Sequence, residues 1–259
     1  MALIASLFMP VVAAGVSAAA SGHEERVLDL RLPDGTRQRV LFWVPPGAKG
    51  TIIMLPGGSG QIGLEPDGRL RHGTNFVVRT RALWVAQGYG VLIPDAIDGA
   101  SLRGVRSSPR YAAIVNALIG FVRAHGAGAV FLLGTSQGSI AAMNGAAHAP
   151  AGRVAGVILT ESVSVMGGSH ETVFSADPRL VRSPALIVAN RDDRCSVAPP
   201  DAAPRIAAAL TGSRDVRVLM VSGGLTRAAR NCDSLTPHGY DGIEAQTVDA
   251  ISRWMDAHR

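Results

Sequence analysis

The sequence is poor in lysine, cysteine and aromatic residues, and it carries no block of like charge. Only one of its 25 basic residues, Lys49, is a lysine, and the arginines are spread along the whole chain. Electrostatic binding of nucleic acid needs basic side chains gathered on one face. The net charge of +5 therefore does not indicate a nucleic-acid partner. Because internal repeats and low-complexity linkers are also missing, residues 21–259 are predicted to form a single domain.

Signals for a bound cofactor are missing as well. The glycine-rich turn at 57–60 has no lysine after its last glycine, a position that phosphate-binding loops fill with lysine. Five of the seven histidines, namely His23, His72, His125, His148 and His170, are interpreted as solvent-exposed or structural, and none of them has a partner at the spacing of a metal site. We therefore expect neither a nucleotide nor a metal, and no other cofactor.

The first twenty residues differ in character from the rest of the chain. An apolar stretch at 2–14 is followed by small residues at 17–20 and then by polar ones. This pattern predicts a signal peptide over residues 1–20 and an exported protein, although no lysine or arginine precedes the apolar stretch. A buried N-terminal helix and a retained anchor are the alternatives. The stretch is short for a membrane span, so no stable membrane insertion is expected after cleavage.

The two cysteines, Cys195 and Cys232, fit an exported protein because an even number of thiols can pair. A bridge between them would close a loop of 37 residues (232 − 195), which chain-entropy arithmetic values at up to about 4 kcal/mol. Two unpaired cysteines in the core are the alternative.

Short apolar runs alternate with helical stretches along the chain, and the central runs are apolar nearly throughout. Such runs are typical of parallel strands that helices cover on both faces. The predicted fold is an α/β, doubly wound, mostly parallel eight-stranded sheet that starts with an antiparallel hairpin. The predicted strands are 26–30, 39–44, 51–55, 90–94, 129–133, 154–160, 185–189 and 216–221, and the predicted helices are 75–87, 108–124, 139–148, 200–210 and 239–258.

A serine stands at one sharp strand-to-helix turn of this pattern. The motif Gly134-Thr135-Ser136-Gln137-Gly138 directly follows the fifth apolar run. Glycines on both sides allow a tight turn that exposes the hydroxyl, and the N–H groups that follow point toward whatever the hydroxyl attacks. This context indicates a nucleophile, and the alternative is an inert serine in a glycine-rich turn.

The order of the motifs resembles that of the α/β-hydrolase family. A glycine-rich turn follows the third strand, the serine motif follows the fifth, acidic residues follow a later strand, and a histidine follows the last one. The Gly-x-Ser-Gln-Gly turn is similar to that of cutinases, small carboxylesterases and thioesterases. Together with the acidic stretch 191–195 and the segment 238–240, it looks like a small exported esterase of the dienelactone-hydrolase or carboxylesterase kind.

This resemblance implies a role for each group in the site. Ser136 is the expected nucleophile, and His238, in the loop before the last helix, is the expected base. The other histidine beyond the last strand, His258, is expected to be solvated. Neighbouring side chains at a strand end point to opposite sides, so at most one of the adjacent Asp192 and Asp193 should face His238. The resemblance implies an acid about four residues beyond the last apolar residue of the strand and just before a short loop, which favours Asp193 over Asp192. Glu161 is a third choice.

Two backbone N–H groups are expected to hold the developing oxyanion. They belong to Gln137 and to Gly58, and Ser59 is the alternative to Gly58. The predicted function is cleavage of a carboxylic ester or thioester through an acyl-enzyme, with a small molecule or a polymer end as substrate. The alternatives are acyl transfer by the same groups and a non-catalytic binding protein on the same fold.

Access to the site is expected to be open. Only residues 161–184 separate the sixth and seventh strands, which leaves no room for a sizeable lid. The segment 61–74, with Glu65, Arg69, Arg71 and His72, either lines the mouth of the site or is a plain solvated loop. Nothing in the sequence predicts an oligomeric state.

Overall fold

The structure is a computed structural model and describes residues 24–259. The predicted signal peptide, residues 1–20, lies outside the described residues and stays a prediction. Within residues 24–259, no helix is both long enough and apolar enough to cross a membrane.

Eight strands form one sheet in the order β1-β2-β4-β3-β5-β6-β7-β8. β1 pairs antiparallel with β2 and β2 antiparallel with β4, whereas every other neighbouring pair is parallel. This confirms the predicted fold class. The strands are β1 (Arg26–Arg31), β2 (Arg37–Trp43), β3 (Gly50–Leu55), β4 (Tyr89–Pro94), β5 (Ala129–Thr135), β6 (Gly156–Thr160), β7 (Ala185–Asn190) and β8 (Val216–Val221).

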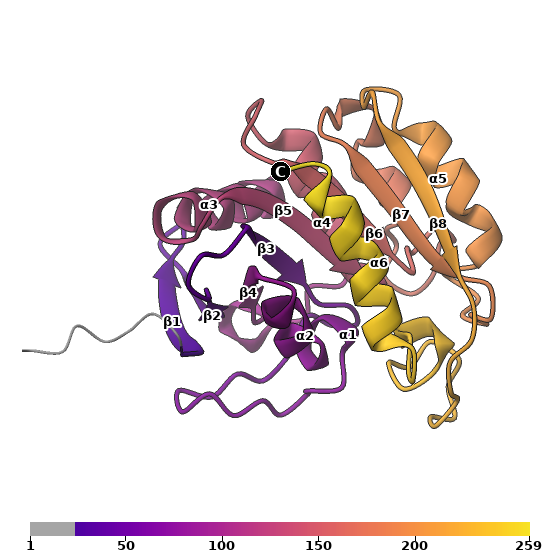
Figure 1. The fold of residues 1–259 in the computed structure, drawn as a ribbon, viewed down its shortest axis with the longest axis horizontal. Coiled ribbons are helices and arrows are strands. Elements are labelled where there is room, and N and C mark those ends of the chain that lie inside the picture. Colours follow the sequence, from indigo (N-terminus) through magenta and orange to yellow (C-terminus); the bar gives the residue numbers. More distant parts are fainter. Residues whose placement is uncertain (1–23) are drawn as a thin grey trace, which may run out of the picture.

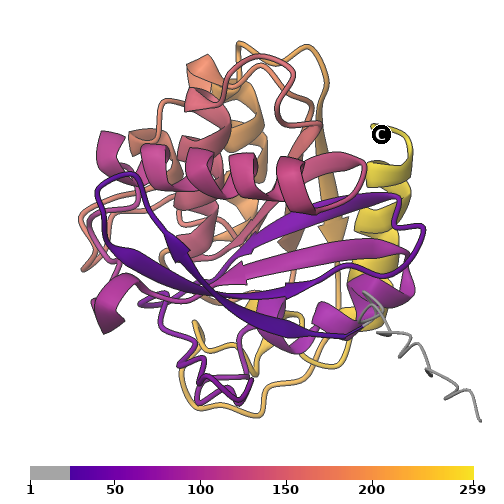
Figure 2. The same cartoon turned by 90° about the vertical axis from the view of Figure 1, so that its left-hand side faces the viewer.

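Helices cover both faces of the sheet, as Figure 1 shows. One face packs against α3 (Pro109–His125), α4 (Gln137–His148) and α5 (Ala203–Ala209). The other face packs against α1 (Phe76–Arg79), α2 (Arg81–Ala86) and α6 (Glu244–Asp256). Figure 2 shows the twist of the sheet, with its N-terminal strands nearest the viewer. Because both faces are covered, every residue of β3, β4, β6 and β7 is buried.

The predicted helix at 75–87 is two short helices that meet at Thr80. The Thr80 hydroxyl donates to Phe76 O at 2.6 Å and accepts from Trp84 Nε1 at 3.1 Å. A threonine that bonds back to the preceding turn competes with the helical ladder and often bends a helix. The continuous helix was therefore a wrong prediction, although both halves cover the sheet.

The last helix also begins later than predicted. Residues Pro237–Gly239 form a single 3₁₀ turn, and Tyr240 (φ 58°) and Gly242 (φ 82°) then take left-handed conformations that end it. α6 starts only at Glu244. Because of this break, His238 stands on a short turn rather than on the helix, at the edge where the parallel strands end.

Within residues 24–259, no inserted domain covers that edge. Between β6 and β7 the chain makes two 3₁₀ turns, Val173–Ser175 and Pro178–Leu180, joined by loops. The predicted absence of a sizeable lid is confirmed. The loops that follow β3, β5, β7 and β8 therefore meet at an open edge of the sheet.

Candidate active site

Ser136 lies at the sharp turn between β5 and α4. Its backbone has φ 53° and ψ −122°, an uncommon region for a residue with a side chain, and strain of this kind gathers at functional sites. Ser136 N donates to Thr160 O at 2.9 Å, which ties the turn to β6. The glycines on either side, Gly134 and Gly138, are needed because neighbouring backbone segments approach each other closely here. A Cβ on Gly134 would lie 2.1 Å from Gly138 O, and one on Gly138 would lie 2.0 Å from Leu55 O.

The structure brings Ser136, His238 and Asp193 into one chain of hydrogen bonds. Ser136 Oγ lies 3.0 Å from His238 Nε2, and His238 Nδ1 lies 2.7 Å from Asp193 Oδ2. His238 is 3% exposed and Asp193 is 6% exposed, so the second contact is shielded from water. With Nδ1 donating to the carboxylate, Nε2 is left as the acceptor that faces the serine hydroxyl.

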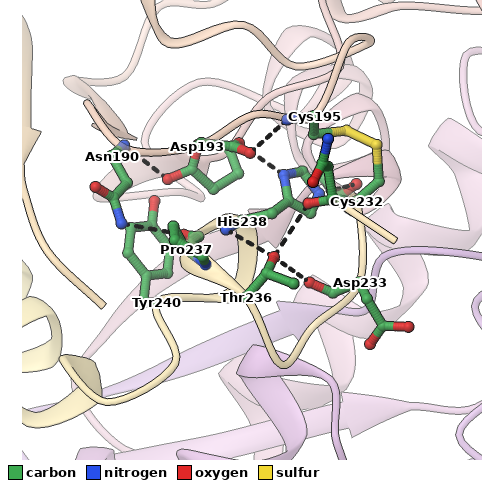
Figure 3. A network of polar contacts seen from close by, with 12 residues as sticks. Asn190, Asp193, Cys195, Cys232, Asp233, Thr236, Pro237, His238 and Tyr240 are labelled. Atoms are coloured by element: carbon green, nitrogen blue, oxygen red, sulfur yellow. Dashed lines mark hydrogen bonds and ion pairs between the residues drawn. A yellow bond between two sulfur atoms is a disulfide. The ribbon is translucent and has the colours of Figure 1, made fainter. Parts of the chain in front are cut away.

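Backbone contacts and a disulfide fix the acid and the histidine. Asp193 N donates to Asn190 O at 3.0 Å, and Asp193 Oδ1 accepts from Cys195 N at 2.8 Å. Cys195 is bonded to Cys232, as the sequence suggested, with the two Cα atoms 4.6 Å apart. Figure 3 shows the carboxylate facing the His238 ring, with the disulfide beside them. The bridge therefore joins the turn after β7 to the segment that carries His238.

The neighbouring Asp192 points elsewhere. It is exposed, and its Oδ2 accepts from Gly223 N at 2.6 Å. Of the two adjacent aspartates, Asp193 alone is therefore placed to orient His238.

Glu161 lies closer to this chain than sequence reasoning indicated. It is 1% exposed, and one of its oxygens lies within 4.8 Å of an Asp193 oxygen and a His238 ring nitrogen. Burial raises the pKa of Glu161 well above its ordinary value, and the Asp193 charge raises it further. These three side chains offer the atoms a cation would need, but His238 Nδ1 and Asp193 Oδ2 already share a hydrogen bond at 2.7 Å.

The two residues expected to supply the oxyanion N–H groups, Gln137 and Gly58, lie next to Ser136 in the chain and in the lining of its cavity, respectively. Gln137 is the first residue of α4, so its N–H has no acceptor within the helix. Gly58 (φ 58°) lies in the turn after β3 and lines the same cavity as Ser136. The turn after β3 packs tightly against the turn that carries Ser136. A Cβ on Gly57 would lie only 2.9 Å from Thr135 O.

A buried arginine supports the turn after β3, and no sequence pattern pointed to it. Arg106 is 1% exposed, and its Nη2 donates to Pro56 O at 3.2 Å. Burial lowers the pKa of Arg106. An isolated arginine in a loop has no periodicity that predicts burial, so only the three-dimensional contact identifies it.

The cavity beside Ser136 has a volume of about 280 Å³ and a polar rim that includes Arg103, Arg230 and Asp233. A second hollow of about 340 Å³ shares Arg230 with it and extends to His72. The segment 61–74 therefore reaches the mouth of the site through His72. Its Glu65 and Arg71 side chains pair with each other.

His258 differs from its expected solvated state. Its ring stacks on Trp254, with the centroids 4.2 Å apart, and its Nε2 lies 2.9 Å from Asp215 Oδ2. A penultimate residue was expected to project into water, but the last turn of α6 instead packs its ring against the helix. His258 therefore has a structural role far from Ser136.

No model of a known protein family and no curated protein matches the sequence. Solved structures do match the fold. The esterase Pf2001 of Pyrococcus furiosus superposes with a TM-score of 0.63 at 10% identity, over 91% of this chain and 93% of that one. The dienelactone hydrolase of Anabaena variabilis gives 0.62 at 16% identity, over 92% and 99%. An alpha-beta serine hydrolase homologue from Coxiella burnetii gives 0.61 at 18%, over 89% and 97%.

These similarities extend over nearly the whole of each chain. The chain therefore has the α/β-hydrolase fold. Because a fold of this kind hosts many activities, the reaction has to be argued from the site.

Proposed function

We propose that this protein is a serine hydrolase that cleaves carboxylic esters through an acyl-enzyme intermediate. The observation that carries the proposal is the hydrogen-bonded chain from Ser136 Oγ to His238 Nε2 and from His238 Nδ1 to Asp193 Oδ2, at 3.0 and 2.7 Å. A hydroxyl, an imidazole and a carboxylate at these distances form the proton-transfer chain of a serine nucleophile. The fold neighbours that are named esterases and hydrolases support the same reaction class.

Each group has one role in the proposed mechanism. Ser136 Oγ attacks the acyl carbonyl while His238 Nε2 takes the hydroxyl proton, and His238 then returns that proton to the leaving alcohol. The Asp193 carboxylate orients the ring and stabilises the imidazolium. The N–H groups of Gly58 and Gln137 hold the oxyanion. Water, activated by His238, then releases the acyl group and restores Ser136.

The dimensions of the cavity favour a small substrate. A volume of about 280 Å³ beside Ser136 holds a short acyl group, and the adjoining hollow of about 340 Å³ leaves room for a leaving group that points toward His72. Because the described part of the chain forms no lid over this edge, the exposed end of a polymer would also reach the serine. Esters and thioesters present the same carbonyl geometry, and we propose the ester as the substrate.

We further propose that the protein is exported. The disulfide between Cys195 and Cys232 supports this location, because such bonds persist in oxidising compartments. The proposed signal peptide over residues 1–20 is consistent with the same location.

Labelling with a fluorophosphonate tests the nucleophile directly. Wild-type protein should lose turnover of a short activated ester in step with labelling, and the label should map to Ser136. Ser136→Ala should neither label nor turn over, while its circular dichroism spectrum stays that of the folded protein. Ser234 lines the same cavity but makes no hydrogen bond to His238 among the described residues, so Ser234→Ala should still label at Ser136. Labelling that survives Ser136→Ala would overturn the proposal.

Product analysis separates hydrolysis from acyl transfer. The acyl group should appear as the free acid in water, and an added alcohol or amine should not capture most of it. Capture of most of the acyl group at millimolar acceptor would assign the same three side chains to a transferase.

A further inference from the structure

A buried glutamate beside the acid of the site has no role in the mechanism above. Glu161 directly follows β6 and is 1% exposed. Its backbone has φ 42°, a conformation unfavourable for a residue with a side chain, and its N–H donates to Val188 O at 3.1 Å. The sheet therefore holds this side chain in place at the cost of local strain, as it does for Ser136.

The two oxygens of Glu161 have different surroundings. Oε1 accepts a hydrogen bond from Asn190 N at 2.7 Å. Oε2 is buried and has no donor among the described residues. The Tyr240 hydroxyl also lies against Glu161, but it is placed to donate to Val188 O at 3.1 Å, while the Glu161 and Asp193 carboxyl groups are in hydrogen-bonding contact with each other. With Glu161 ionised, Oε2 would be an unsatisfied anion buried beside a second carboxylate, which is a costly arrangement.

We propose that Glu161 is a positioning residue that carries a proton on Oε2 and donates it in a hydrogen bond to Asp193. Asp193 then accepts from three donors, which are Cys195 N–H, His238 Nδ1–H and the Glu161 hydroxyl. Three donors fix the orientation of the carboxylate and stabilise its charge, and both properties serve its action on His238. The inference depends on the proposed function only for its kinetic consequence.

The electrostatics of the pocket agree with this protonation state. The titratable groups that face Glu161 are Asp193, from the turn after β7, and His238 and Tyr240, from the segment after β8. Burial is the largest cause that raises the pKa of Glu161, and Asp193 raises it further. Burial also raises the pKa of Tyr240 well above its ordinary value, so Tyr240 keeps its own proton.

Infrared spectroscopy of the full chain tests the proton without any measurement of activity. Wild-type protein at about pH 8 should show the carbonyl band of a protonated carboxylic acid, and Glu161→Gln should lack it. Glu171 is the matched control, because it is 2% exposed but its oxygens accept from Gly104 N, Ser107 N and Ser107 Oγ. The band should survive Glu171→Gln. A wild-type spectrum without the band, or a band that survives Glu161→Gln, would overturn the proposal.

The kinetic consequence separates positioning from simple packing. The amide of Glu161→Gln keeps a donor for Asp193 and an acceptor for Asn190 N, so kcat should stay within about threefold of wild type. Glu161→Leu fills similar space without a donor, so kcat should fall about 10- to 100-fold while KM changes little. Equal losses in both variants would refute the positioning role. If wild-type protein cleaves no ester but the band behaves as expected, the proposed function fails and the protonation of Glu161 stands.

Discussion

Replacing Glu161 by glutamine should make the protein progressively more stable than wild type as the pH rises. The substitution removes one titratable proton and keeps the shape of the side chain. Its amide oxygen can still accept from Asn190 N, which lies 2.7 Å from Glu161 Oε1, and its NH₂ group can donate to Asp193. The change with pH in the stability difference between Glu161→Gln and wild type therefore reports the proton on Glu161 alone.

The magnitude follows from proton linkage. In the unfolded chain the pKa of a glutamate is near 4.5, and burial raises the pKa of Glu161 well above that value in the folded protein. Folding thus takes up one proton wherever the pH lies between the two values. Wild-type stability falls there by about 1.4 kcal/mol for each pH unit, and the glutamine variant has no such term. Across two pH units within that range, the variant should gain about 2.7 kcal/mol relative to wild type.

Urea denaturation at a series of pH values measures this difference. The fluorescence of Trp84 and Trp254, which are both buried, reports unfolding. The midpoint difference between variant and wild type should widen steadily above about pH 4.5 while the m-values stay equal, since equal m-values show that the same surface is exposed. A difference that stays flat from acid to neutral pH would show that Glu161 is ionised in the folded protein, and the reasoning would be wrong.

Three further outcomes are expected. Reducing the disulfide should lower the free energy of unfolding by at most about 4 kcal/mol, because its loop spans 37 residues, and should also lower kcat. Calorimetry measures the first effect and an ester assay the second, each with and without reductant. Asp193→Asn should lower kcat by up to about 10⁴-fold through loss of the correct His238 tautomer, whereas Asp192→Asn should leave kcat within a few fold. Gly138→Ala should prevent folding, because its Cβ would lie 2.0 Å from a backbone oxygen. Gly120→Ala, by contrast, places its Cβ in open space on α3 and should raise the free energy of unfolding by about 0.5–1 kcal/mol.

Much of the fold could be predicted because strands covered on both faces are recognisable as apolar runs. The eight runs gave the right number of strands, and the antiparallel start followed from the short turn between the first two. The break at Thr80 could not be predicted, because it depends on a hydroxyl bonded to Phe76 O and to Trp84 Nε1. The late start of α6 depends on two left-handed residues whose conformation tertiary packing decides.

The candidate site was predictable to a similar depth. Ser136 and His238 stand at turns that the sequence marks with glycine and proline. Side-chain alternation indicated that only one of Asp192 and Asp193 faces His238, and the family resemblance favoured Asp193. Glu161 was considered only as an alternative acid. One signal could have raised its rank, namely that it directly follows a parallel strand and so must lie at the same edge as Ser136. Its protonation depends on burial and on the distance to Asp193, and neither can be read from the order of residues.

The separation along the chain of the residues in the site determines when their contacts form during folding. Ser136 meets His238 across 102 positions of the chain, and Asp193 meets it across 45. Closing such long stretches is entropically unfavourable, so these contacts form only after the strands between them are in register. Ester hydrolysis would therefore report that folding is complete. During refolding it should return together with, or later than, the circular dichroism signal of the helices, and never before it.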